Sequence, residues 1–145
     1  MMNHTFIFNS GVWLGEGKIT LTVSPECLTF FTKWEIKEQT EGVMTATQIV
    51  EIEGMEERMI NCFTFKEIVS TTFGVFLENH LVGSVIGQGV LNDLTIKWMY
   101  HTQSNFEGFE IYEKQKNGNY FFHAEYGAPD EYQTRIEGLI WSKSI

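Results

Sequence analysis

The sequence contains little cysteine and little proline. Of its 145 residues, 2 are cysteine and 2 are proline, beside 13 glycines and 12 phenylalanines. Cys27 and Cys62 lack the spacing of a metal site or of a CxxC redox motif, so we expect two buried, reduced thiols, with a disulfide as the alternative. Few prolines among many glycines and aromatic residues are typical of strands joined by tight turns.

Basic residues are also scarce. The chain has 10 lysines and arginines against 19 acidic residues, which gives a formal net charge of −9. Nucleic acids and anionic membrane surfaces attract positive charge, so we expect neither as a partner. The same balance is ordinary for a soluble cytosolic protein.

Long apolar segments are missing. No run approaches the length of a transmembrane helix. Residues 1–9 contain no basic region, and their apolar run is too short for a secretion signal. We therefore expect a cytoplasmic protein.

Helical periodicity is absent as well, and alternation of apolar and polar residues takes its place. The alternation is broken by turn residues at the spacing expected for an up-and-down barrel or a sandwich. We find no linker or low-complexity tract, and expect one domain over residues 1–145. The strands are expected at 11–23, 28–38, 43–53, 58–66, 70–78, 81–90, 94–102, 109–116, 119–126 and 132–143.

The strand expected at 11–23 carries the most specific pattern. Trp13, Gly15 and Gly17 share its inner face, and glycine there lets another backbone approach closely. This opening resembles the first strand of the calycin superfamily, which comprises lipocalins, fatty-acid-binding proteins and nitrobindin-like proteins. The closing stretch from Arg135 to Trp141 is similar to the last strand of calycins.

The resemblance implies a fold and two structural roles. About ten strands fit the fatty-acid-binding and nitrobindin-like branches, so the expected fold is all-β: a single antiparallel up-and-down barrel. Residues 24–27 are too few for the helical lid of fatty-acid-binding proteins. The resemblance also implies that Trp13 plugs the narrow end of the barrel. Arg135 either packs on this tryptophan by a cation–π contact or faces solvent.

Alternation predicts which side chains face the interior. The inward set that combines apolar area with polar groups consists of Trp34, Gln48, Ser84, Gln88, Trp98, Tyr100, Glu113, Tyr120 and Tyr126. Part of this assignment assumes two-residue hairpin loops at Asn79-His80 and Asn117-Gly118. A three-residue loop with a bulge at the second hairpin would turn one strand over.

This polar interior suggests a small-molecule site. Buried polar groups need partners, which a wet cavity or a ligand would provide. Alternatively they pair among themselves or lie at the rim. Glu113 is the one carboxylate predicted to face inward. There it would have a raised pKa and could act as a general base, or it would lie solvated at the barrel mouth.

The sequence therefore predicts a binding protein for a small apolar or amphipathic molecule. Two alternatives stay open: an enzyme on a calycin scaffold, of the isomerase or bilin-attachment type, or a filled barrel with a structural or interaction role. Nitrobindin-like proteins hold haem through a histidine inside the barrel. None of the four histidines (His4, His80, His101 and His123) is predicted to face inward, so we expect no haem, no metal and no other cofactor.

Overall fold

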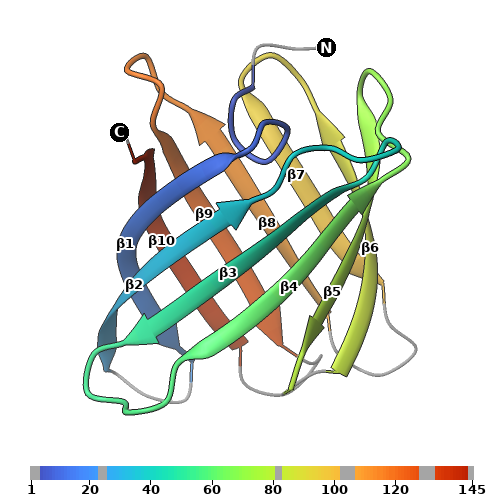
Figure 1. The fold of residues 1–145 in the computed structure, drawn as a ribbon. Helices are drawn as coiled ribbons and strands as arrows, with labels where there is room; N and C mark the ends of the chain where they lie inside the picture. The colour runs from blue at the N-terminus through green and yellow to red at the C-terminus, as the bar shows by residue number, and fades with distance from the viewer. Residues whose placement is uncertain (1–3, 23–25, 81–82, 102–106, 128–132, 144–145) are drawn as a thin grey trace.

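The structure of the protein, a computed structural model, describes residues 4–22, 26–80, 83–101, 107–127 and 133–143. These residues form one closed antiparallel barrel of ten strands, and they contain no helix (Figure 1). The strands are β1 (Gly11–Leu21), β2 (Cys27–Ile36), β3 (Met44–Ile52), β4 (Met59–Lys66), β5 (Thr72–Asn79), β6 (Gly83–Leu91), β7 (Thr95–His101), β8 (Glu107–Lys114), β9 (Tyr120–Gly127) and β10 (Gln133–Ser142).

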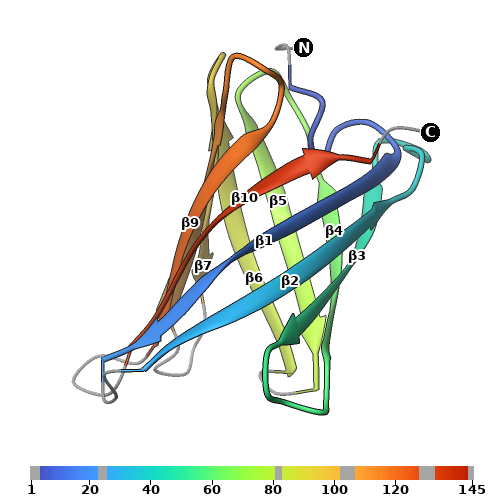
Figure 2. The same ribbon diagram turned by 90° about the vertical axis from the view of Figure 1, so that its left-hand side faces the viewer.

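Each strand pairs with its neighbour in sequence, and β1 pairs with β10 to close the barrel. Figure 2 shows β1 lying between β10 and β2. The predicted all-β up-and-down barrel is confirmed, and each strand begins and ends within a few residues of its predicted range. No helix in the described ranges is long and apolar enough to span a membrane.

Glycines draw β1 and β10 together at the seam. Gly17 pairs with Gly138, and a Cβ atom on Gly17 would lie 2.1 Å from the carbonyl oxygen of Glu137. Only glycine fits such a backbone approach. The close approach predicted for the inner face of this strand is confirmed.

The hairpin between β5 and β6 corrects one prediction. Asn79 pairs with Gly83, so three residues connect the strands where two were assumed. Gly83 has a positive φ of 73°, which suits glycine at the end of the turn. The pairing shift turns β6 over, so Ser84 and Gln88 are exposed on the outer face and their predicted inward placement is wrong.

Inward glycines on β6 have a packing reason. A Cβ atom on Gly89 would lie 2.1 Å from the ring of Phe73, which occupies the space that a side chain would need. Gly89 therefore makes room for an aromatic ring from β5, whereas a Cβ atom on Gly87 would lie 2.3 Å from the carbonyl oxygen of Met99 on β7.

The hairpin between β8 and β9 corrects a second prediction. Lys114 pairs with Tyr120, and the backbone N–H of Gln115 donates to the carbonyl of Asn119 at 2.7 Å. This is the longer-loop alternative, which turns β8 over relative to the two-residue loop. Glu113 is exposed and its predicted inward placement is wrong; the inward carboxylate of this strand is Glu110.

The segment that precedes β1 closes one end of the barrel. Figure 1 shows the N-terminal coil at the end of the barrel where β1 begins. Phe6, Ile7 and Phe8 are buried, although they belong to no strand. We call this end the plugged end. The opposite end, where β1 finishes and β2 begins, is the distal end.

Candidate functional site

Six of the residues predicted to line the interior do face it. Trp34, Gln48, Trp98, Tyr100 and Tyr120 are buried, and Tyr126 is half-buried. Their orientation is confirmed, whereas contact with a ligand stays a prediction. They divide between the two ends of the barrel, and the two groups differ in what surrounds them.

The plugged end is filled by aromatic rings. The Phe6 ring lies 5.2 Å from Trp34 and 5.6 Å from Tyr120, measured between ring centroids. Trp34 also stacks on Phe63 at 5.0 Å. Trp13, as predicted, is buried here, with its ring 5.4 Å from that of Phe6. The tryptophans and Tyr120 thus pack against protein side chains, as expected of a solid aromatic core.

His4 fastens the N-terminal segment to the barrel. Its Nε2 donates to the carbonyl of Asn92 at 2.5 Å, and its Nδ1 lies 2.7 Å from the Tyr120 hydroxyl. Burial lowers the pKa of His4, which favours the neutral ring that accepts a hydrogen bond at Nδ1. The prediction that no histidine faces inward is wrong for this residue, but both of its ring nitrogens are occupied.

Several inward side chains towards the distal end keep contact with solvent. The apolar ones that pack on the core while remaining only half-buried are Leu28, Val50, Ile52, Tyr126 and Ile136. On the same faces nearer the plugged end, Trp34, Met44 and Ile140 are fully buried. Packing thus loosens towards the distal end on β2, β3, β9 and β10, whereas Ile19, Leu77 and Val85 on β1, β5 and β6 remain buried there.

A buried carboxylate with tyrosine partners borders this distal half: Tyr100 and Tyr126 lie towards the distal end, whereas the ring of Tyr112 lies 4.8 Å from that of Phe6 in the N-terminal segment. The Tyr100 hydroxyl donates to Oε2 of Glu110 at 2.5 Å, and the Tyr112 hydroxyl donates to Oε1 at 2.6 Å. Tyr126 also hydrogen-bonds this carboxylate, and the indole N–H of Trp98 donates to the Tyr100 hydroxyl at 2.8 Å. We call Glu110 with Tyr100, Tyr112 and Tyr126 the acid–tyrosine cluster.

Burial governs the ionisation of the cluster. It raises the pKa of Glu110, against the opposing effect of the tyrosine hydrogen bonds. Burial also holds the pKa of Tyr100, Tyr112 and Tyr126 well above the usual range, so all three remain protonated donors. No basic side chain is among the groups that shift the pKa of Glu110.

A chain of neutral polar groups crosses the opposite wall. Asn79 donates to Asn61 at 2.9 Å, Asn61 donates to Gln48 at 2.9 Å, and Gln48 donates to Thr32 at 3.1 Å. The chain runs from β5 through β4 and β3 to β2 and satisfies Gln48 internally. The alternative that interior polar groups pair among themselves therefore holds for Gln48.

One buried polar atom has no partner. In the described part of the chain, Nε1 of Trp34 is the only buried side-chain nitrogen or oxygen without a hydrogen bond. An unpaired buried donor of this kind costs about 1–3 kcal/mol. The tight aromatic packing around Trp34 accounts for its burial, and we have no physical account of the missing bond.

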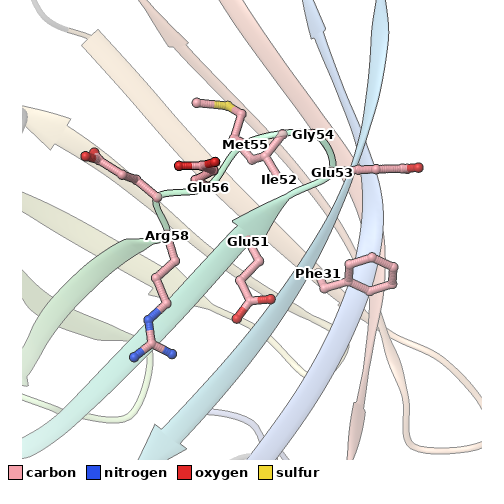
Figure 3. Close-up of a pocket in the computed structure, with 9 residues that line it drawn as sticks. Phe31, Glu51, Ile52, Glu53, Gly54, Met55, Glu56 and Arg58 are labelled. Atoms are coloured by element: carbon pink, nitrogen blue, oxygen red, sulfur yellow. The ribbon is translucent and has the colours of Figure 1, made fainter.

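A separate hollow lies on the surface beside the turn that joins β3 to β4. Its volume is about 390 Å³, and its lining residues, shown in Figure 3, are Phe31, Glu51, Ile52, Glu53, Gly54, Met55, Glu56, Glu57 and Arg58. Four of these are glutamates against one arginine. Acidic side chains around a surface turn are typical of a solvated surface. The shape of this hollow alone does not define a binding site.

The remaining candidate groups lie on the outer surface. Cys27 and Cys62 are free and exposed, so the predicted burial of both thiols is wrong. His123 lies 2.8 Å from Glu125 and 3.3 Å from Glu137 on the outer face. Among the described residues, no group of His, Cys, Asp and Glu has an arrangement that could hold a metal ion.

Arg135 takes the solvent-facing alternative. Its side chain is 58% exposed, and it lies 3.9 Å from Glu125. The register places Arg135 opposite Thr20, at the other end of β1 from Trp13. The cation–π contact implied by the calycin resemblance does not form.

Comparison with solved structures identifies a similar barrel. The crystal structure of Rv2717c from M. tuberculosis has a TM-score of 0.72 to this chain at 9% sequence identity. The alignment covers 93% of this chain and 92% of that chain. No protein-family model matches the chain, and no curated protein matches its sequence. At this identity the likeness concerns the fold alone.

Proposed function

We propose that this protein binds one small, largely apolar molecule in the distal half of its barrel. The observation that carries the proposal is the half-buried state of inward apolar side chains such as Leu28, Val50 and Ile136. Side chains that face the inside of a closed barrel and still reach solvent leave room for a guest.

The chemistry of the distal half supports a ligand with one polar group. Its walls are mostly aliphatic and aromatic, and the amides of Asn79, Asn61 and Gln48 on one wall are bonded to one another. Glu110 and Tyr126 supply the polar groups that would fix an orientation. This combination is the usual lining of a small-molecule site. The residues proposed to contact the ligand are Val50, Tyr100, Glu110 and Tyr126. Trp34 and Tyr120 belong to the packed end, and Trp98 lies between the two ends, packed on Phe63 and Tyr112.

The calycin resemblance and the cellular compartment belong to the same proposal. The similarity in fold to Rv2717c over most of both chains fits a calycin-like barrel. Exposed, unpaired thiols at Cys27 and Cys62 suit a reducing compartment, which supports the cytoplasm. The formal charge of −9 supports a small-molecule partner over nucleic acid or an anionic membrane.

The test is a titration with a neutral apolar fluorophore, N-phenyl-1-naphthylamine. We expect saturable uptake of about one probe per chain, and weaker uptake by Tyr126→Ala. Lys97→Ala, on the outer face, is the matched control and should bind as the wild type does. Native mass spectrometry of freshly purified protein would reveal a ligand that co-purifies.

The main rival is a barrel filled throughout, with a structural or interaction role. The aromatic packing of the plugged end favours it for that half of the molecule. If the folded protein takes up no probe and carries no co-purified molecule, the filled barrel is correct and the binding function is wrong.

A further inference from the structure

We infer that the ligand of the distal half carries an organic ammonium group, which the acid–tyrosine cluster binds. This inference rests on the proposed function and names the chemical class of its ligand.

The acid that faces the inside of the barrel, Glu110, is not paired with a basic side chain in the described part of the chain. Glu110 is 4% exposed, and its partners are tyrosine hydroxyls. None of the ten lysine and arginine side chains is buried, and none is among the groups that act on Glu110. A carboxylate held in an apolar site without a cation is stabilised strongly by a cationic ligand.

Aromatic rings surround this carboxylate in a way that suits a cation. The rings of Tyr100 and Tyr126 lie 6.2 Å apart at an interplanar angle of 32°. Trp98 stacks on Tyr112 at 5.2 Å, directly beside the cluster. Faces of tyrosine and tryptophan attract organic ammonium groups, and rings gathered around an acid recognise quaternary ammonium ligands.

Access to the cluster is from the side of Tyr126. This residue is the half-buried member, while Tyr100, Glu110 and Tyr112 are buried. A Cβ atom on Gly108 would lie 2.7 Å from the Tyr126 ring and 3.4 Å from the Tyr100 ring, so a glycine keeps the two rings in place. An ammonium group entering from the distal end would meet Tyr126 first and Glu110 behind it.

The same space offers an anionic ligand no basic side chain among the described residues. The opposite wall offers Asn79, Asn61 and Gln48, which are neutral and already hydrogen-bonded to one another. A fatty-acid carboxylate placed here would be near Glu110 with no cation to offset the repulsion. The cluster therefore selects by charge sign as well as by shape.

The experiment compares three amphiphiles with the same tail: decyltrimethylammonium, decanol and decanoate, each below its micelle concentration, by isothermal titration calorimetry. We expect the ammonium to bind at least about tenfold more tightly than decanoate, equivalent to about 1.4 kcal/mol. Decanol should lie between them. In Glu110→Gln the ammonium should lose its advantage over decanol, with the affinity for decanol unchanged.

Glu113→Gln is the matched control, because Glu113 lies on the same strand but is exposed. It should leave all three affinities as in the wild type. Decanoate binding as tightly as the ammonium, or an ammonium preference that survives Glu110→Gln, would overturn the inference. Even if Glu110→Gln does not fold, the three wild-type affinities show whether the site prefers a cationic or an anionic ligand. Absence of binding by all three would overturn the proposed binding function itself.

Discussion

Phe6→Ala tests the role of the N-terminal segment as a plug. The Phe6 side chain is 0% exposed although it lies outside every strand. Its ring centroid lies 4.8 Å from Tyr112, 5.4 Å from Trp13 and 5.2 Å from Trp34. Removal of this ring should therefore cost as much as removal of a core residue held within the sheet.

The magnitude follows from the area that the ring buries. An aromatic side chain buries about 150–250 Å², and at about 25 cal/mol per Å² this corresponds to roughly 4–6 kcal/mol as an upper bound. Partial collapse of the site brings the expected cost to about 3–5 kcal/mol, the range for deletion of a core phenylalanine. With m-values of about 1–3 kcal/mol/M, the urea midpoint should fall by at least about 1 M.

The assay is urea unfolding followed by tryptophan fluorescence and circular dichroism. Phe121→Ala is the control, since Phe121 is 40% exposed on the outer face of β9 and should cost less than about 1 kcal/mol. A Phe6→Ala midpoint no lower than that of Phe121→Ala would refute the reasoning and show that the N-terminal segment does not close the barrel.

Three further predictions concern backbone approach and ionisation. Gly17→Ala should lower the free energy of unfolding by more than the usual cost of overpacking, about 1–3 kcal/mol, because its Cβ would meet the backbone of Glu137. Gly74→Ala is the control in the same urea assay and should be nearly neutral, because the nearest atom to its Cβ would be 3.5 Å away. The pKa of His4 is lowered in the folded chain, so the unfolded chain takes up the proton first as the pH falls. Stability should therefore fall as the pH drops below about 6.5, and His4→Leu should flatten that slope. The raised pKa of Glu110 has the opposite sign: the folded chain holds the proton longer, so its contribution is complete below the ordinary value of 4.5 and is lost as the pH rises through the raised pKa. Glu110→Gln should remove that loss, and an unchanged dependence of the urea midpoint on pH would contradict the buried placement.

Strand positions could be predicted because alternation is a local property. In β2, β3 and β7, period-two patterning together with the outward placement of charged residues such as Lys97 identifies the inward residues, among them Trp34, Gln48 and Trp98. The loop lengths of the β5–β6 and β8–β9 hairpins could not be predicted in this way. One extra loop residue reverses the faces of a whole strand, so Ser84, Gln88 and Glu113 were assigned to the wrong side.

The acid–tyrosine cluster was missed for the same reason, since Glu110 and Tyr112 lie on the strand that was turned over. Alternation in this strand leaves two readings: Phe109 and Ile111 inward, or Gly108 and Tyr112 inward. The expected two-residue loop at Asn117-Gly118 selects the first, and charge does not separate the two, because one places Glu113 inside and the other Glu110. Two partners of Glu110, Tyr100 and Tyr126, come from β7 and β9, and their proximity is visible only once the strands are paired.

The plug formed by residues 4–8 carries no periodic signal. Its burial depends on a gap at the end of the finished barrel and on Asn92 and Tyr120, which lie far away in sequence. Ile7 has a positive φ of 58°, which is unfavourable for a β-branched residue. Tertiary packing sets this conformation, and local sequence could not have predicted it.

The most direct test of a binding site in the distal half is a substitution that fills this half with a larger inward side chain. Val50 faces inward there and is half-buried, whereas Ile60 on the neighbouring strand is 42% exposed on the outer face. We expect Val50→Trp to abolish uptake of N-phenyl-1-naphthylamine while the barrel still unfolds cooperatively in urea. Ile60→Trp, which adds the same side chain outside, should bind about one probe per chain as the wild type does. Undiminished uptake by folded Val50→Trp would contradict a binding site in the distal half of the barrel.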